Sequence, residues 1–114
     1  MKTHLVTPLL NREVILRASV YTADKRSIYL DSRDAETGEP VYTITSFVDE
    51  ESPFLTDTQI LVKNYSENRG LAEAMILAGL GRIARDDSMF VRFEVTNPEL
   101  LALMNAARTT AAVK

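Results

Sequence analysis

Hydrophobic and polar residues alternate along much of the chain. Between residues 13 and 22, one side of the alternation consists of apolar residues only, namely Val14, Leu16, Ala18 and Val20. A period of two predicts a half-buried β-strand. The same reasoning predicts strands over 27–31, 41–48, 59–63 and 89–95. An earlier segment, 4–10, can pair with the first strand, but Pro8 confines it to a sheet edge.

The period lengthens after Lys63. Apolar residues over 71–80 recur at helical spacing, and Ile76, Leu77 and Leu80 widen the stripe until we expect a helix covered around most of its circumference. Gly79 or Gly81 can end this helix, and the next residues, 82–88, are expected to form a loop or a last turn. A second helix is predicted after Asn97 as N-cap, because Pro98 suits the first helical position.

These elements indicate an α+β protein. We expect an antiparallel, mostly meandering sheet of about five strands, packed on one buried helix, with a further helix at the C-terminus. With 114 residues the chain is expected to form one domain, with its core over 12–107 and a frayed tail over 108–114.

Composition excludes several kinds of chemistry. The chain has no cysteine and one histidine, His4, so disulfides, thiolate nucleophiles and His/Cys metal sites are not expected. No catalytic residues, metal or cofactor are predicted, and we expect the protein not to be an enzyme. No apolar run approaches the roughly 20 residues that span a bilayer, and the N-terminus is too interrupted for a signal peptide. We therefore expect a cytoplasmic protein with no membrane contact.

Negative charge is concentrated between residues 34 and 57. This segment has no lysine or arginine and holds seven carboxylates: Asp34, Glu36, Glu39, Asp49, Glu50, Glu51 and Asp57. Such a segment disfavours direct nucleic-acid binding, which depends on basic side chains, but it suits a basic protein partner. We predict that Asp49, Glu50 and Glu51, with Glu36 and Glu39, bind that partner. The alternative is that these residues only keep the surface solvated.

The stretch VKNYSENRG, residues 62–70, joins a predicted strand to a predicted helix. Asn64 and Glu67 have the spacing of a capping box, and Ser66 could cap the helix instead. Gly70 within a helix would cost about 1 kcal/mol relative to alanine, which suggests that another backbone crosses closely there. We interpret the stretch as a structural joint. The alternative is a ligand site formed by Tyr65, Ser66, Glu67 and Asn68.

The sequence contains the strings AETGEPVYTITSFV and ILVKNYSENRGLAEAMILAGL. They resemble a family of small bacterial proteins of unknown function that occur on chromosomes, plasmids and phages. The family is marked by a T-G-E-P hairpin followed by a V-K-[DN]-Y-S-E-N-x-G strand–helix joint, and the match covers residues 13–80. Arg69 departs from the acid that the family often has there. The resemblance implies the same α+β unit and no particular activity.

Together these features predict a small non-enzymatic, cytoplasmic protein-interaction module. The resemblance implies an accessory or host-interaction role for a phage or mobile element, and a host-defence component is the kind of protein partner that we expect. Two alternatives remain open: a small ligand-binding or enzymatic domain that uses residues 65–68, and a homo-oligomer joined through sheet edges.

Overall fold

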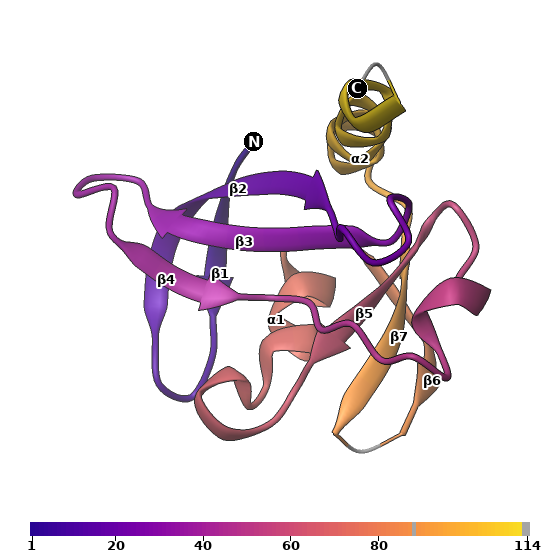
Figure 1. Cartoon of the computed structure of the whole chain (residues 1–114). Coiled ribbons are helices and arrows are strands. Elements are labelled where there is room, and N and C mark those ends of the chain that lie inside the picture. The colour runs from indigo at the N-terminus through magenta and orange to yellow at the C-terminus, as the bar shows by residue number, and fades with distance from the viewer. Residues whose placement is uncertain (88, 113–114) are drawn as a thin grey trace.

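The computed structural model describes residues 1–87 and 89–112 and confirms the α+β class. Figure 1 shows its strands and helices, which are numbered in their order along the chain. The strands are β1 Lys2–Val6, β2 Asn11–Val20, β3 Ile28–Asp34, β4 Pro40–Thr43, β5 Gln59–Lys63, β6 Gly81–Asp86 and β7 Phe90–Val95. The helices are α1 Leu71–Leu77 and α2 Pro98–Ala112, with short 3₁₀ turns η1 Ser52–Phe54 and η2 Ser66–Asn68.

The strands form two antiparallel sheets. The first has the strand order β1-β2-β3-β4 and the second the order β5-β7-β6. We expected one sheet of about five strands, whereas the described part of the chain has seven strands in two sheets. The sheets meet where the chain leaves β4, because Thr45 bridges Val62 and the Lys63 amide donates to the Ile44 carbonyl at 2.8 Å. The segment after β4 therefore belongs to both layers.

Strand β6 lies where a loop or a last helical turn was expected. Its sequence, GRIARD, has one large apolar residue, Ile83, which pairs with Phe93, and most of the strand is exposed at a sheet edge. An edge strand with one solvated face needs little apolar sequence, so its pattern is weak. Gly81 does not end a helix; it pairs with Val95, and a Cβ there would collide with the Glu94 carbonyl.

The predicted alternation holds in the central strands. In β3 every second residue is buried, starting with Ile28, and in β7 the buried residues are Val91, Phe93 and Val95. Helix α2 packs on β2 and buries Leu100 and Met104 completely. Burial of each such side chain contributes about 1.5–3 kcal/mol, so α2 is part of the core.

Helix α1 is shorter and less covered than expected. Leu71, Ala72, Ala74 and Met75 are buried, but Leu77 is 83% exposed and Ile76 is also exposed, so the prediction of an all-round buried helix was wrong. Gly79, with φ of 77°, ends the helix. The Leu80 amide then donates to the Met75 carbonyl and the Gly79 amide to that of Ile76, both at 3.0 Å, which is a Schellman motif.

The start of α2 is as predicted. The Asn97 side-chain oxygen accepts from the amides of Glu99 and Leu100, both at 3.0 Å, and Pro98 is the first helical residue. The helix continues through residues 108–112, where a frayed tail was expected; residues 113–114 lie outside the described part. Arg108 explains the extension, because its side chain donates to the backbone carbonyls of Arg26 and Asp57.

Candidate functional site

The stretch 62–70, which we call the joint, does not form the predicted capping box. Glu67 turns to Lys63, with 2.9 Å between Oε1 and Nζ, and does not reach the Asn64 amide. The Asn64 side-chain oxygen accepts instead from the amide of Ala72, at 2.9 Å, and so caps α1 from outside the helix. Ser66 makes no cap either, because η2 interposes a separate turn before α1.

Gly70 directly precedes α1 and has a left-handed backbone with φ of 82°. The close approach suggested for this glycine is present: a Cβ would lie 2.9 Å from Cδ of Pro8, in the turn between β1 and β2. The crossing group is a proline ring, not a backbone. Gly70 is thus required by both its backbone angle and its neighbour.

Of the four residues predicted as a ligand site, two line a cavity and two do not. Glu67 and Asn68 contribute to a cleft described below. Tyr65 is half-buried and packs edge-on against Phe90, with 5.7 Å between ring centroids, and the Lys63 ammonium lies 5.1 Å from the Tyr65 ring. Ser66 is exposed and has a left-handed backbone with φ of 58°.

The cleft is about 410 Å³ in volume and lies between the first sheet and the joint. One wall comes from β3 and β4 and the other from the joint. Its lining is Tyr29, Asp31, Ser32, Arg33, Pro40, Val41, Tyr42, Thr43, Lys63, Glu67 and Asn68. Asn68, which is 1% exposed, ties the walls together, because its side-chain amide donates to the Thr43 carbonyl at 2.7 Å. We call this the polar cleft.

Most of the charges in the polar cleft are paired. Asp31 forms an ion pair with Arg17 on the neighbouring strand, at 3.3 Å, and Glu67 pairs with Lys63. The Lys63 ammonium, which donates to Glu67, lowers the pKa of Glu67 to about 2, and the Glu67 carboxylate in turn raises the pKa of Lys63. Both groups therefore stay ionised near neutral pH. Arg33 has no carboxylate partner among the described residues.

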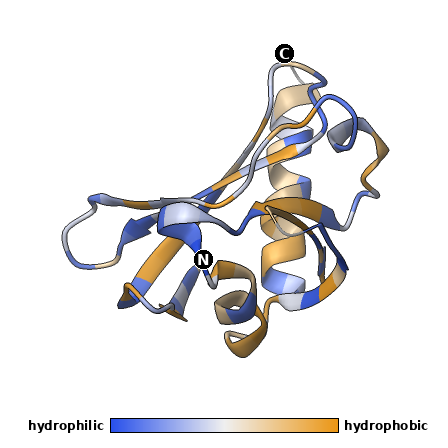
Figure 2. Ribbon diagram, turned by 90° about the horizontal axis from the view of Figure 1, so that it is seen from below, coloured by the Kyte–Doolittle hydropathy of each residue, from blue (hydrophilic) through white to orange (hydrophobic). Residues whose placement is uncertain are grey.

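The acidic residues predicted to bind a partner fall into two groups at opposite ends of the molecule. Glu36 and Glu39 lie in the turn between β3 and β4, at the far left of Figure 1, whereas Asp49, Glu50 and Glu51 lie beside η1 at the right. Figure 2, seen from below, separates the same two segments. In the described part of the chain none of the five forms an ion pair.

Two other carboxylates of the acidic segment are neutralised internally. Asp34 is buried and pairs with Arg12 at 3.1 Å, while its Oδ1 accepts from the amides of Glu36 and Thr37. Asp57 pairs with Arg26, also at 3.1 Å. The segment that the sequence describes as uniformly acidic thus separates into structural carboxylates and free ones.

The loop over residues 48–55, which we call the η1 loop, is anchored from within. Ser52 is 1% exposed; its hydroxyl accepts from the Val48 amide at 2.8 Å, and its carbonyl accepts from the Ser27 hydroxyl at 3.1 Å. Leu55 is buried, and its carbonyl accepts from the Arg26 guanidinium. Between these anchors Phe54 is 73% exposed. It is the one aromatic side chain among the exposed large hydrophobic residues in the described part of the chain.

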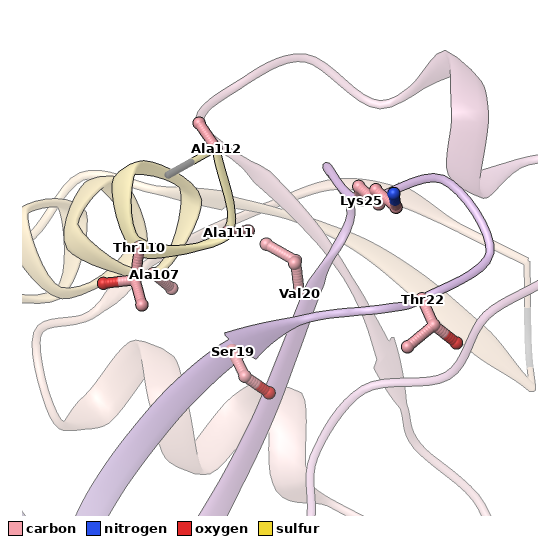
Figure 3. Close-up of a pocket in the computed structure, with 8 residues that line it drawn as sticks. All are labelled: Ser19, Val20, Thr22, Lys25, Ala107, Thr110, Ala111 and Ala112. Atoms are coloured by element: carbon pink, nitrogen blue, oxygen red, sulfur yellow. The ribbon is translucent and has the colours of Figure 1, made fainter. Parts of the chain in front are cut away.

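A second, mostly apolar hollow of about 520 Å³ lies between the end of β2 and the C-terminal turns of α2 (Figure 3). Ser19, Val20, Thr22 and Lys25 line one side, and Ala107, Thr110, Ala111 and Ala112 the other. Lys25 is its one charged residue. The hollow therefore brings together no pair of groups suited to acid–base or nucleophilic chemistry.

Residues 1–87 and 89–112 also decide on metal sites and membrane-spanning helices within the described part of the chain. No cluster of three or more His, Asp or Glu side chains there could hold a metal ion. His4 is exposed on β1 and hydrogen-bonds to the Asn11 side chain. Within the same residues, no helix combines the length and apolar character needed to cross a membrane.

Comparisons with models of known protein families, with curated proteins and with solved structures found no match. The chemistry of the polar cleft and of the η1 loop has therefore to be inferred from their own geometry.

Proposed function

We propose that the protein is a non-enzymatic, cytoplasmic interaction module that binds a basic protein partner through the η1 loop. The observation that carries this proposal is Phe54, a large aromatic side chain that projects from an anchored loop beside three free carboxylates. Aromatic side chains dominate the binding energy of many protein interfaces. An accessory role for a phage or mobile element, with a host-defence component as one such partner, is supported by the resemblance in residues 13–80.

Preorganisation is the first argument for this surface. A loop that becomes ordered only on binding loses conformational entropy at that moment. The η1 loop avoids most of this cost, because Ser52 and Leu55 already fix both sides of its projecting part. Phe54 is therefore presented in one place without help from a partner.

Charge is the second argument. Asp49, Glu50 and Glu51 have no basic neighbour that pairs with them in the described chain, in contrast to Asp57, which Arg26 neutralises. A partner with arginine or lysine around an apolar pocket would complement both the carboxylates and the phenyl ring. Glu36 and Glu39, at the other end of the molecule, would form a separate and weaker acidic contact, outside the surface that Phe54 centres.

The test uses the full chain as bait in a lysate of the host bacterium, followed by purification of any captured protein and calorimetric titration. We expect Phe54→Ala to weaken binding about 30-fold or more, as for an interface hot spot. Reversal of Asp49, Glu50 and Glu51 to lysine should abolish binding, and raised salt should weaken it. The matched control reverses Glu36 and Glu39 and should change the affinity much less.

Two outcomes would overturn the proposal. One is a captured protein whose affinity is unchanged by both the Phe54 and the carboxylate substitutions. The other is capture of nothing but a second copy of the chain, with a dimer mass in solution, which would favour the homo-oligomer joined through the free edges of β1 or β6.

A further inference from the structure

We propose that the polar cleft is a binding site for a small organic ligand that carries an oxyanion, either a carboxylate or a phosphate group, and that Arg33 receives this group. This site lies on β3, β4 and the joint, and it is separate from the η1 loop. It would therefore function independently of a protein partner.

The first observation is an incomplete set of hydrogen bonds at Arg33. Its Nη1 donates to the Gly38 carbonyl at 3.2 Å, but its Nε is buried and has no hydrogen-bond acceptor in the described part of the chain. A buried charged donor without an acceptor is rare in folded proteins and calls for an explanation. An oxyanion in the cleft would supply the missing acceptor once the Arg33 side chain, which also lines the cleft, turns its Nε toward it.

The second observation is the balance of charge in the lining. The carboxylates of Asp31 and Glu67 are each already paired with a basic side chain, Arg17 and Lys63 respectively. When Arg17, which lies outside the lining, is counted with Asp31, Arg33 is the one positive charge of the lining without a carboxylate partner. A guanidinium presents its donors in a planar fork that matches two oxygens of a carboxylate or phosphate. The cleft thus favours an anion over a cation.

The third observation concerns the remainder of the ligand. A volume of about 410 Å³ lies within the range of small-molecule sites and is too small for a folded partner. Tyr29 and Thr43 add hydroxyl groups to the lining, and Pro40 and Val41 add apolar surface. These residues suit a compact organic anion with hydroxyl or amide groups.

Rigid walls complete the site. The hydrogen bond from Asn68 to the Thr43 carbonyl fixes the joint against β4. The Lys63–Glu67 pair holds two lining side chains against each other, and the low pKa of Glu67 keeps this pair charged over a wide pH range. The cleft is therefore open before any ligand enters.

The test is an NMR titration of the ¹⁵N-labelled full chain with inorganic phosphate and, separately, with acetate. Sodium chloride at matched ionic strength is the reference. We expect the Nε–H signal of Arg33 to shift and saturate, together with the backbone amides of Thr43, Lys63 and Asn68. The matched control is the Nε–H signal of Arg92, which is also buried without an acceptor but lies on β7, outside the cleft. It should not respond.

Comparison of the two titrations distinguishes the sources of the oxyanion: tighter saturation by phosphate indicates a phosphorylated ligand, and tighter saturation by acetate a carboxylic acid. Arg33→Gln should weaken the response about tenfold or more, as expected for loss of a charge-assisted hydrogen bond. Arg33→Lys, which keeps the charge but loses the fork, should fall between. The η1-loop substitutions should leave the titration unchanged, so this site can fail without the proposed function failing.

The inference is overturned if the Arg33 signal moves no more than the Arg92 signal, or if chloride shifts it equally. It is also overturned if Arg33→Gln, with a folded spectrum, responds to both anions as the unaltered chain does. The main measurement is the Arg33 Nε–H shift in the unaltered protein, so failure of a variant to fold does not affect it.

Discussion

The side-chain amide of Asn68 donates to the backbone carbonyl of Thr43 at 2.7 Å and so attaches the joint to β4. Asn68 is almost completely buried, so its removal leaves a carbonyl without this donor. We expect Asn68→Ala to lower the free energy of unfolding by about 1–3 kcal/mol. Urea denaturation followed by circular dichroism measures this loss.

The control for Asn68 is Asn105→Ala, on the exposed side of α2. It should change the free energy of unfolding by no more than about 0.5 kcal/mol. Equal effects of the two substitutions would show that the bond between Asn68 and Thr43 does not hold the walls of the polar cleft together.

Comparison of Gly70 with Gly38 separates two reasons why a position requires glycine: a left-handed backbone and a close neighbour. Both have positive φ, 82° and 77°, but a Cβ at Gly38 would meet nothing within 4 Å, whereas one at Gly70 would press on Pro8. Gly38→Ala should therefore cost about 1–2 kcal/mol, for the left-handed backbone alone. Gly70→Ala should cost more, because the clash adds to the backbone strain.

A double-mutant cycle tests this assignment. Pro8→Ala removes the ring, so the cost of Gly70→Ala measured in that background should fall toward the cost of Gly38→Ala. The stability of each variant is again measured by urea denaturation. Additive effects of the Pro8 and Gly70 substitutions would contradict a direct contact between them.

Local sequence predicts those parts of the fold whose causes are local. The cap at Asn97 depends on neighbours two and three residues away, and it forms as expected. The capping box at Asn64 also has the right spacing, but one local partner and one distant partner take side chains of the joint instead. Lys63 takes the Glu67 carboxylate, and Asn68 is drawn to Thr43, far away along the chain.

The polar cleft could not be read from the sequence for the same reason. Arg33 and Lys63 lie on different strands, and nothing in their spacing indicates that both line one cavity.

In the acidic segment, residues that are neighbours in the sequence were wrongly expected to share one surface. A continuous run of charge along the chain predicted one surface, but the turn that carries Glu36 and the η1 loop lie at opposite ends of the fold (Figure 1).

Asp34 should make the free energy of unfolding fall as the pH is lowered into the acid range. The amides of Thr37 and Glu36 that donate to its carboxylate, helped by the nearby Arg12 guanidinium, lower its pKa from the ordinary value of 3.8. Because the folded pKa lies below the unfolded one, its stabilisation is full above about pH 4. It is lost as the pH falls through the folded pKa.

The measurement compares the unaltered chain with Asp34→Asn by urea denaturation from neutral to strongly acidic pH. Asparagine can still accept the two turn amides but carries no charge. We expect a constant difference in stability near neutral pH that shrinks on acidification below about pH 4. Parallel curves down to the lowest pH would mean that Asp34 has the same pKa in the folded and unfolded chain.

Leu77 and Leu80 belong to the same apolar stripe in the sequence but have opposite roles in the structure. Leu77 is 83% exposed at the end of α1, whereas Leu80 is completely buried beyond the Schellman turn. Leu80→Ala should lower the free energy of unfolding by about 2–5 kcal/mol, because it leaves a cavity in the core. Leu77→Lys should change it by less than about 0.5 kcal/mol, since lysine also suits a helix C-terminus. Thermal denaturation of both variants measures the contrast. A comparable loss in Leu77→Lys would show that this end of α1 is covered in solution, as the sequence pattern alone predicts.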